Sequence, residues 1–447
     1  MTRVAMASLV GSAIEFYDFF LYGTAAALVF PTVFFPYLGT TMATVASLAT
    51  FAAAFFSRPL GAGIFGHFGD RVGRKATLVA TLLIMGLSTV AVGLLPGAAT
   101  IGVAGPLILL ALRLLQGIAL GGEWAGSALL LAEHAPCGKR GQYGMFTPLG
   151  AGVGLVLANL AMLAVNFTIG ETSPAFLTWG WRVPFLFSAV LVVVALYVRL
   201  NITETPVFAS QKLRAKVDAA VPTAPIAELF RAQSRQVVLA AGCAVGPFTL
   251  SFMAATYLMT YARTELGHSR NLILFVGVLG GLSSIALTVP AAVWSDHVGR
   301  RRVMLCGFAV GVPWAFAVMP LMDTGDPALF GIAIVVTYAI LGVLTAPLSS
   351  FIPETFATGY RYTGAGLAFN MGGIIGGAVP PMLAGALAAS VGSWAIGLMM
   401  AILILTSLGC TVLLPETMGS SLTDSETRTD TETRTDTETI RTDAKTR

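Results

Sequence analysis

Charged side chains occur at five places inside long apolar stretches of the chain. The polar residues concerned are Glu15, Asp18 and Tyr22 in the first stretch, Arg58 in the second, and Arg113, Gln116 and Glu123 in the fourth. Within each stretch their spacing places them on one face of a helix. Each charge costs about 2.5–3.5 kcal/mol at the centre of a membrane helix, so five facing lipid would cost more than ~10 kcal/mol. These side chains must therefore face one another or a wet cavity.

Carboxylates and guanidinium groups at similar depth are suited to moving protons and binding anions. A low-dielectric cavity favours the neutral carboxyl group, whereas a nearby Arg favours the carboxylate. We therefore expect Asp18, Glu123 and Glu15 to take part in proton coupling. We expect Arg58 and Arg113 to neutralise them or to grip a substrate carboxylate with two hydrogen bonds. Structural ion pairs are the alternative, although buried pairs seldom add net stability.

Uncharged polar and aromatic residues complete the candidate substrate site. The second half of the chain has no comparable charge within its apolar stretches, so tyrosine and asparagine are its better polar candidates. Such residues pack more often than they bind a ligand. The substrate-binding candidates are Tyr22, Arg58, Arg113, Gln116, Trp124, Tyr257 and Asn370.

The composition indicates a membrane protein. The chain has 447 residues, of which 56% are hydrophobic and 11% charged, and its mean hydropathy is +0.81. A soluble protein carries roughly a quarter charged residues. The net charge of +4 does not suggest a nucleic-acid partner, and the four cysteines match no metal or redox spacing. A phosphate-binding G-x-x-x-x-G-K-[ST] loop is missing from the sequence, which disfavours an ATP-driven pump.

About twelve stretches reach the roughly 20 apolar residues that a helix needs to cross a bilayer. They begin near residues 6, 42, 77, 106, 144, 182, 236, 271, 303, 328, 363 and 393. Basic residues concentrate in alternate connections, which puts those loops and both termini in the cytoplasm. We therefore expect an all-α polytopic protein with twelve transmembrane helices. The expected parts are a six-helix half (1–200), a cytoplasmic connection (201–235), a second half (236–415) and a cytoplasmic, mostly disordered Thr/Asp/Glu/Arg tail (416–447).

Two loop sequences are repeated between the halves, as in transporters whose two halves rock around a central site. An Asp in such a loop can form an ion pair with Arg and can accept hydrogen bonds from the first backbone N–H groups of a neighbouring helix. We expect such contacts to close one face of the protein in one state and to break in another. Loop topology alone explains the basic residues but not the acids. The gating candidates are Gly66, Gly69, Asp70, Arg71, Gly73, Arg74, Glu133 and Arg140, with Asp296, Gly299, Arg300, Glu354 and Arg361 in the second half.

Three segments resemble a known family. Residues 66–75 (GHFGDRVGRK) resemble the loop signature of the major facilitator superfamily, and residues 11–23 and 113–124 are similar to its metabolite:proton symporters. The similarity covers nearly the whole chain except the tail. In the second-half loop, however, Ala292 replaces the leading Gly and His297 the usual Arg, which predicts a weaker contact there.

The resemblance implies the major facilitator fold, alternating access and a bacterial inner-membrane location. It also implies proton-coupled uptake of a small metabolite such as shikimate, a dicarboxylate, or proline and betaines. We expect a secondary transporter, not an enzyme, that carries an organic acid and needs only substrate, protons and the bilayer. No cofactor, metal or obligate protein partner is expected. The alternatives are a proton-driven exporter or antiporter of a drug or metabolite, and a transporter-like membrane sensor that signals through its tail.

Overall fold

The computed structural model describes residues 2–72, 74–136, 138–170, 173–200, 225–357 and 360–419. Within these ranges it does not describe the side chains of residues 2–4, 66–72, 74–76, 130, 133–134, 198–199 and 225–227. The described part of the chain is helical and contains no β-strand.

The first half contributes six long helices. They are α1 (Thr2–Leu28), α3 (Gly39–Val72), α4 (Arg74–Leu94), α6 (Ala104–His134), α8 (Phe146–Ile169) and α9 (Arg182–Leu200). Four short elements lie between them: α2 (Phe30–Phe34), α5 (Ala98–Ile101), α7 (Arg140–Gly144) and the π-helical turn η1 (Phe176–Gly180).

The second half contributes six more crossings, two of which contain a π-helical turn. The crossings are α11 (Pro225–Phe252) with η2 (Met253–Tyr257) and α12 (Leu258–Thr264); α13 (Arg270–Val298); α14 (Arg300–Asp323); α15 (Pro327–Glu354); α16 (Arg361–Gly373) with η4 (Ile374–Ala378) and α17 (Val379–Val391); and α18 (Trp394–Leu413). Such turns are often found at functional sites.

Twelve crossing helices confirm the predicted fold class. Among the described residues, eleven helical segments are long and apolar enough to span a membrane, and α1, with 27 residues, is the twelfth long helix. The observed starts follow the hydropathy pattern closely. Helix α11 begins at Pro225, inside the expected connection 201–235, but it is interrupted at Gln233 (φ −137°, ψ 32°), so the helix beyond this kink begins close to the expected residue 236. Residues 201–224 and 420–447 of the expected connection and tail lie outside the described residues.

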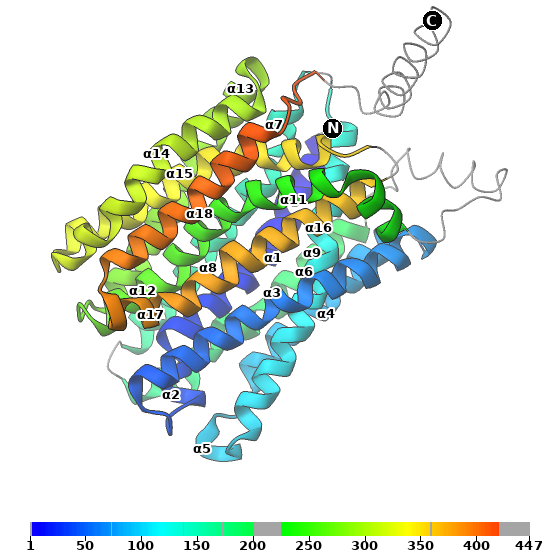
Figure 1. Ribbon diagram of the computed structural model, residues 1–447. Coiled ribbons are helices and arrows are strands. Elements are labelled where there is room, and N and C mark those ends of the chain that lie inside the picture. The colour runs from blue at the N-terminus through cyan, green and yellow to red at the C-terminus, as the bar shows by residue number, and fades with distance from the viewer. Residues whose placement is uncertain are drawn as a thin grey trace, which may run out of the picture.

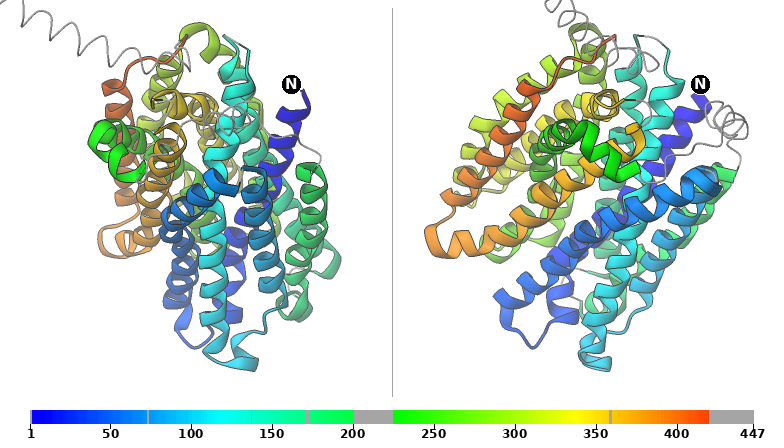
Figure 2. Two further views of the ribbon diagram at one scale, coloured as in Figure 1. Left: turned by 90° about the vertical axis from the view of Figure 1, so that its right-hand side faces the viewer. Right: turned by 45° about the vertical axis from the view of Figure 1, so that its right-hand side comes forward.

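The two halves lie side by side along the bundle. Figure 1 shows the helices coloured blue to cyan on one side and those coloured green to red on the other, and Figure 2 shows the same grouping from two further directions. Helix α8 packs on α1 of its own half and on α13 of the other, so it joins the halves. The N-terminus and α7 lie at one end of the bundle, here called the terminal end, and α2 and α5 lie at the opposite, distal end.

Close packing of α3 on α6 fixes the depth of the buried charges. A Cβ atom on Gly121 would lie 1.9 Å from the carbonyl oxygen of Arg58, so only glycine permits this approach. Small residues allow membrane helices to pack in this way. The contact holds Arg58 of α3 at the level of the Glu123 turn of α6.

Candidate transport site and gates

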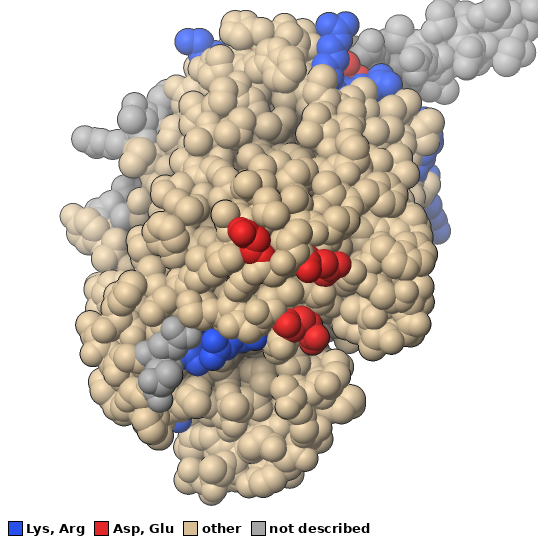
Figure 3. Space-filling model, turned by 90° about the vertical axis from the view of Figure 1, so that its left-hand side faces the viewer, with Lys and Arg blue, Asp and Glu red and all other residues tan. Residues whose placement is uncertain are grey.

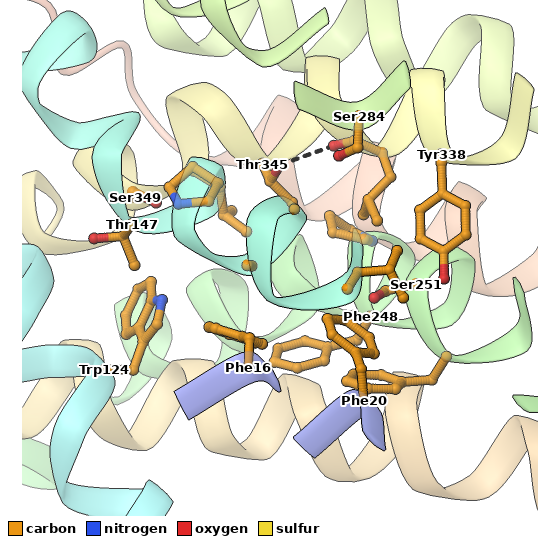
Figure 4. Close-up of a pocket in the computed structure, with 18 of the residues that line it drawn as sticks. Phe16, Phe20, Trp124, Thr147, Phe248, Ser251, Ser284, Tyr338, Thr345 and Ser349 are labelled. Atoms are coloured by element: carbon orange, nitrogen blue, oxygen red, sulfur yellow. Dashed lines mark hydrogen bonds between the residues drawn. The ribbon is translucent and has the colours of Figure 1, made fainter. Parts of the chain in front are cut away.

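A cavity of about 90 Å³ lies between the two halves in the middle of the bundle. Figure 4 shows the rings of Phe16, Phe20, Trp124 and Phe248 along one side of the cavity, whereas Ser284, Thr345 and Ser349 of α13 and α15 lie on the other. The polar side chains that line it are Trp124, Thr147, Ser251, Ser284, Tyr338, Thr345 and Ser349. None of the lining residues in the described part of the chain is charged.

An aromatic layer separates this cavity from the buried charges of the first half. The ring of Phe19 lies 5.0 Å from Phe51, 5.5 Å from Phe55 and 5.3 Å from Phe252, measured between centroids. All four rings are almost completely buried. In this state the buried charges of the first half do not line the cavity.

Asp18 is the most enclosed carboxylate of this group, with 1% of its surface exposed. Ser188 donates a hydrogen bond of 2.6 Å to its Oδ1. Its Oδ2 has no hydrogen-bond partner among the described residues. The neighbouring Thr89 hydroxyl donates instead to the Met85 carbonyl oxygen.

Arg113 interacts electrostatically with Asp18, but the two side chains do not form an ion pair in the described part of the chain. Its Nη1 donates to Gln116 Oε1 at 2.9 Å, and Gln116 Nε2 donates to Thr89 Oγ1 at 2.9 Å. The guanidinium also lies over the Tyr22 ring, 4.1 Å from its centroid. Arg113 is thus held by neutral and aromatic groups.

Arg58 is the other buried arginine in this region of the first half. Its guanidinium lies over the rings of Phe19 and Phe55, at 4.7 and 4.4 Å from their centroids. Glu15 is its electrostatic partner. Glu123 is buried on α6 with 1% of its surface exposed. The structure therefore groups Glu15 with Arg58 and Asp18 with Arg113.

The remaining substrate candidates lie in different places. Tyr22 donates to Thr50 Oγ1 at 2.9 Å, on the charged side of the aromatic layer. Trp124 lines the cavity and stacks on Phe369 across the two halves, with 3.5 Å between ring centroids. Asn370 donates to the Gly121 carbonyl oxygen at 3.2 Å, also across the halves. Of the uncharged candidates, only Trp124 lines the cavity.

A second hollow of about 680 Å³ opens at the distal end, and we call it the vestibule. Tyr257 lines it, together with Tyr261, Glu265 and Asp323. Tyr261 donates to one oxygen of Asp323 at 2.6 Å and Ser393 donates to the other at 2.5 Å. Figure 3 shows acidic side chains gathered on the face that lies to the left in Figure 1.

The terminal end is closed by contacts that cross between the halves. Asp296 accepts hydrogen bonds from the backbone N–H groups of Gly141, at 2.8 Å, and Gln142, at 2.9 Å, and pairs with Arg300 at 2.8 Å. Glu354 lies 3.6 Å from Arg140 and 3.7 Å from Arg300. We call Arg140–Gln142, Asp296, Arg300 and Glu354 the latch. It brings together candidates from both halves.

The latch differs in one respect from the sequence pattern. Glu133 and Arg140 have the same separation in the sequence as Glu354 and Arg361, but Arg140 contacts Glu354 of the other half. Arg361 is buried and donates from Nε to the Phe356 carbonyl oxygen at 3.3 Å. Of the first-half candidates, Gly73 lies outside the described residues. Gly66, Gly69, Asp70, Arg71, Arg74 and Glu133 belong to described helices, but the structure does not describe their side chains.

Sequence reasoning missed two residues that support the latch. Glu416 and Thr417, which we assigned to the tail, follow α18 and contact the latch. Glu416 accepts from the backbone N–H of Arg300 at 2.9 Å, and Thr417 donates to Glu354 at 2.6 Å. Gly299 has a φ of +106°, and a Cβ there would lie 2.4 Å from Glu416 Oε2, so glycine is required. The sequence signal that could have identified Glu416 was an acidic residue directly after the last apolar stretch.

Comparisons with known proteins agree on the family. The model of the Major Facilitator Superfamily matches residues 9–379 and 264–444. The inner membrane metabolite transport protein YhjE of Escherichia coli K12 is 43% identical over 94% of this chain and 95% of its own length. The shikimate transporter of the same organism is 37% identical over 86% of this chain and 87% of its own length.

The fold is also that of a solved member of the superfamily. The proton:xylose symporter XylE, bound to 6-bromo-6-deoxy-D-glucose, superposes with a TM-score of 0.72 at 17% identity, covering 94% of this chain and 97% of its own. The twelve-helix bundle, the latch sequences and these relatives lead to one conclusion: the chain is a membrane transporter, not an enzyme, and belongs to the metabolite transporters of the major facilitator superfamily.

Proposed function

We propose that the protein imports a small organic acid together with a proton, by alternating access. Shikimate is the first candidate substrate, because a shikimate transporter is among the relatives, and dicarboxylates are the second. The protein lies in the bacterial inner membrane with both termini in the cytoplasm, so the terminal end is cytoplasmic and the vestibule faces outward. Proton flow is the driving force, and no cofactor is required.

The observation that carries this proposal is the environment of Asp18. A carboxylate with one hydrogen bond, one oxygen without a partner and no ion pair in the described part of the chain is poorly compensated for its burial. A structural ion pair has the opposite character, since both oxygens are then satisfied. The free Oδ2 is therefore the atom that takes the proton. Arg113 opposes protonation until a helix movement changes their separation.

Symport of a monoanionic substrate with one proton is electroneutral, because the two together carry no net charge. The proton is bound by Asp18 behind the aromatic layer, and the substrate is bound in the cavity, whose lining residues in the described part of the chain carry no charge. Arg58 and Arg113 then act on Glu15 and Asp18 behind the aromatic layer, and the substrate itself contacts the cavity walls. When the vestibule closes and the latch opens, the cavity becomes accessible from the cytoplasm instead of from outside.

Proton movement by the unmodified protein tests this function. De-energised cells that express the protein are challenged in turn with shikimate, 2-oxoglutarate, citrate, proline and betaine while the external pH is recorded. We expect alkalinisation with shikimate. Silence across the panel from protein shown to be folded in the membrane, or acidification on substrate addition, would contradict symport and favour a proton-driven exporter.

A further inference from the structure

The Tyr338 hydroxyl is a buried polar group that the fold leaves without a hydrogen bond. Only 1% of the Tyr338 surface is exposed, and its oxygen has no partner among the described residues. An unpaired buried hydroxyl destabilises a protein, so its presence calls for an explanation.

The position of the ring is firmly set. Tyr338 projects from α15 and packs against α13, where a Cβ on Gly280 would lie 2.5 Å from its Cδ2 atom. Figure 4 shows the ring at one side of the cavity with its hydroxyl end toward Ser251. The hydroxyl is therefore presented to the cavity by the packing of two helices of the second half.

Three serines that line the cavity also have hydroxyl groups without a hydrogen bond in the described part of the structure. Ser251 of α11, Ser284 of α13 and Ser349 of α15 line the cavity, and the described part of the structure shows no hydrogen bond for their hydroxyl groups. Hydroxyls elsewhere in these helices behave differently. Thr249, Thr288 and Thr337, for example, each donate to the carbonyl oxygen four residues earlier, which is the usual arrangement in a helix.

The cavity thus combines unpaired hydroxyl groups with aromatic rings. The unpaired hydroxyl groups of Tyr338, Ser251 and Ser284 come from the second half. The rings come from both halves: Phe16, Phe20 and Trp124 from the first, and Phe248, Phe252 and Phe369 from the second. A ligand that satisfies both has hydroxyl groups along one edge and an apolar face. An extended dicarboxylate has neither, and it would bring a second charge into a cavity that contains no cation.

We infer that Tyr338, with Ser251 and Ser284, binds the hydroxyl groups of a small hydroxylated ring and so determines which substrates the transporter accepts. This inference rests on the proposed function and narrows its substrate class from organic acids in general to hydroxylated cyclic ones. A site that hydrogen-bonds a substrate hydroxyl rejects the analogue that lacks it, because its own polar groups then remain unpaired.

Binding to the purified full-length protein in nanodiscs tests the inference independently of proton coupling. The probes are shikimate, quinate, 2-oxoglutarate and cyclohex-1-ene-1-carboxylate, which is shikimate without its three hydroxyl groups. We expect at least one hydroxylated ring to bind about 10-fold or more tightly than the cyclohexene acid. In Tyr338→Phe this ratio should fall at least about 5-fold, through weaker binding of the hydroxylated ring alone.

A matched variant separates selectivity from folding. Tyr17→Phe removes a tyrosine hydroxyl that donates to the Pro184 carbonyl oxygen at 2.8 Å, outside the cavity lining, and should keep the selectivity of the wild type. Tyr338→Phe should unfold at the same temperature as the wild type or higher, because it loses an unpaired group. Unchanged selectivity in Tyr338→Phe, equal binding of the cyclohexene acid, or failure of both hydroxylated rings to bind would overturn the inference. Selective binding without proton movement would instead contradict only the symport mechanism.

Discussion

The substitution Asp296→Asn is expected to open the latch. Asp296 accepts two hydrogen bonds from backbone N–H groups of the other half, at 2.8 and 2.9 Å, and pairs with Arg300 of its own half at 2.8 Å. Of these three contacts of Asp296, only the two hydrogen bonds from backbone N–H groups cross between the halves and are broken when the halves separate. An Asn amide retains one acceptor oxygen and presents an NH₂ group to the second N–H, so at least one charge-assisted hydrogen bond is lost.

The size of the effect follows from that one bond. Hydrogen bonds to charged groups contribute about 1.5–3 kcal/mol. A loss of that size from the closed state alone shifts the ratio of open to closed molecules by roughly 10- to 150-fold. We expect Asp296→Asn to change the conformational equilibrium without unfolding the protein, since the contact lies at one end of the bundle.

Distances between spin labels measure this shift. Labels at Lys139 and Met418, which are exposed residues of different halves near the terminal end, should report a longer separation in the open state. Asp326→Asn is the matched control, because Asp326 also accepts two backbone hydrogen bonds, from Ala328 and Leu329, but within one half at the distal end. The same distance distribution in Asp296→Asn as in the wild type, or an equal shift in Asp326→Asn, would contradict the role of Asp296 in closing the terminal end.

Two further substitutions test the positioning of the buried charges. Arg58→Lys loses the planar stacking of the guanidinium on Phe19 and Phe55, worth about 1 kcal/mol. The melting temperature should therefore fall, whereas the affinity for substrate should stay unchanged, because Arg58 does not line the cavity. Thermal unfolding measures the first quantity and equilibrium binding the second. A large loss of affinity would place Arg58 in the substrate site. Gly121→Val should prevent α3 from packing on α6, since a Cβ there meets the Arg58 carbonyl oxygen at 1.9 Å, whereas a Cβ on Gly63 of α3 meets no atom within 4 Å. Folded protein recovered from membranes should be lost in Gly121→Val and kept in Gly63→Val, and equal recovery would contradict the packing argument.

Sequence patterns were sufficient for features that depend on local periodicity. The apolar stretches predicted the spans because a membrane helix must be apolar along its whole length. The cost of burying charge predicted that Asp18, Arg58 and Arg113 lie among one another. Asp296 and Arg300 stood out because an acid next to basic residues is not explained by loop topology.

Features that depend on contacts between distant residues could not be predicted in this way. Glu416 caps α14 from 116 positions away in the chain, and no spacing rule connects the two. Single hydroxyl residues such as Ser251 and Tyr338 form no pattern within an apolar helix, so only the structure shows that they share a cavity. The position of Arg58 and Arg113 behind an aromatic layer likewise depends on rings from both halves.

Transport by Asp18→Asn in proteoliposomes tests whether Asp18 carries the proton that drives uptake. Asn keeps the shape of the side chain and the hydrogen bond from Ser188 but cannot carry the proton on Oδ2. With radiolabelled shikimate and an inward proton gradient, the wild type should accumulate substrate above its external concentration. Asp18→Asn should lose this uphill accumulation and still exchange internal for external substrate at equal concentrations. Uphill accumulation by Asp18→Asn at the wild-type level would contradict the account and remove Asp18 from the proton pathway.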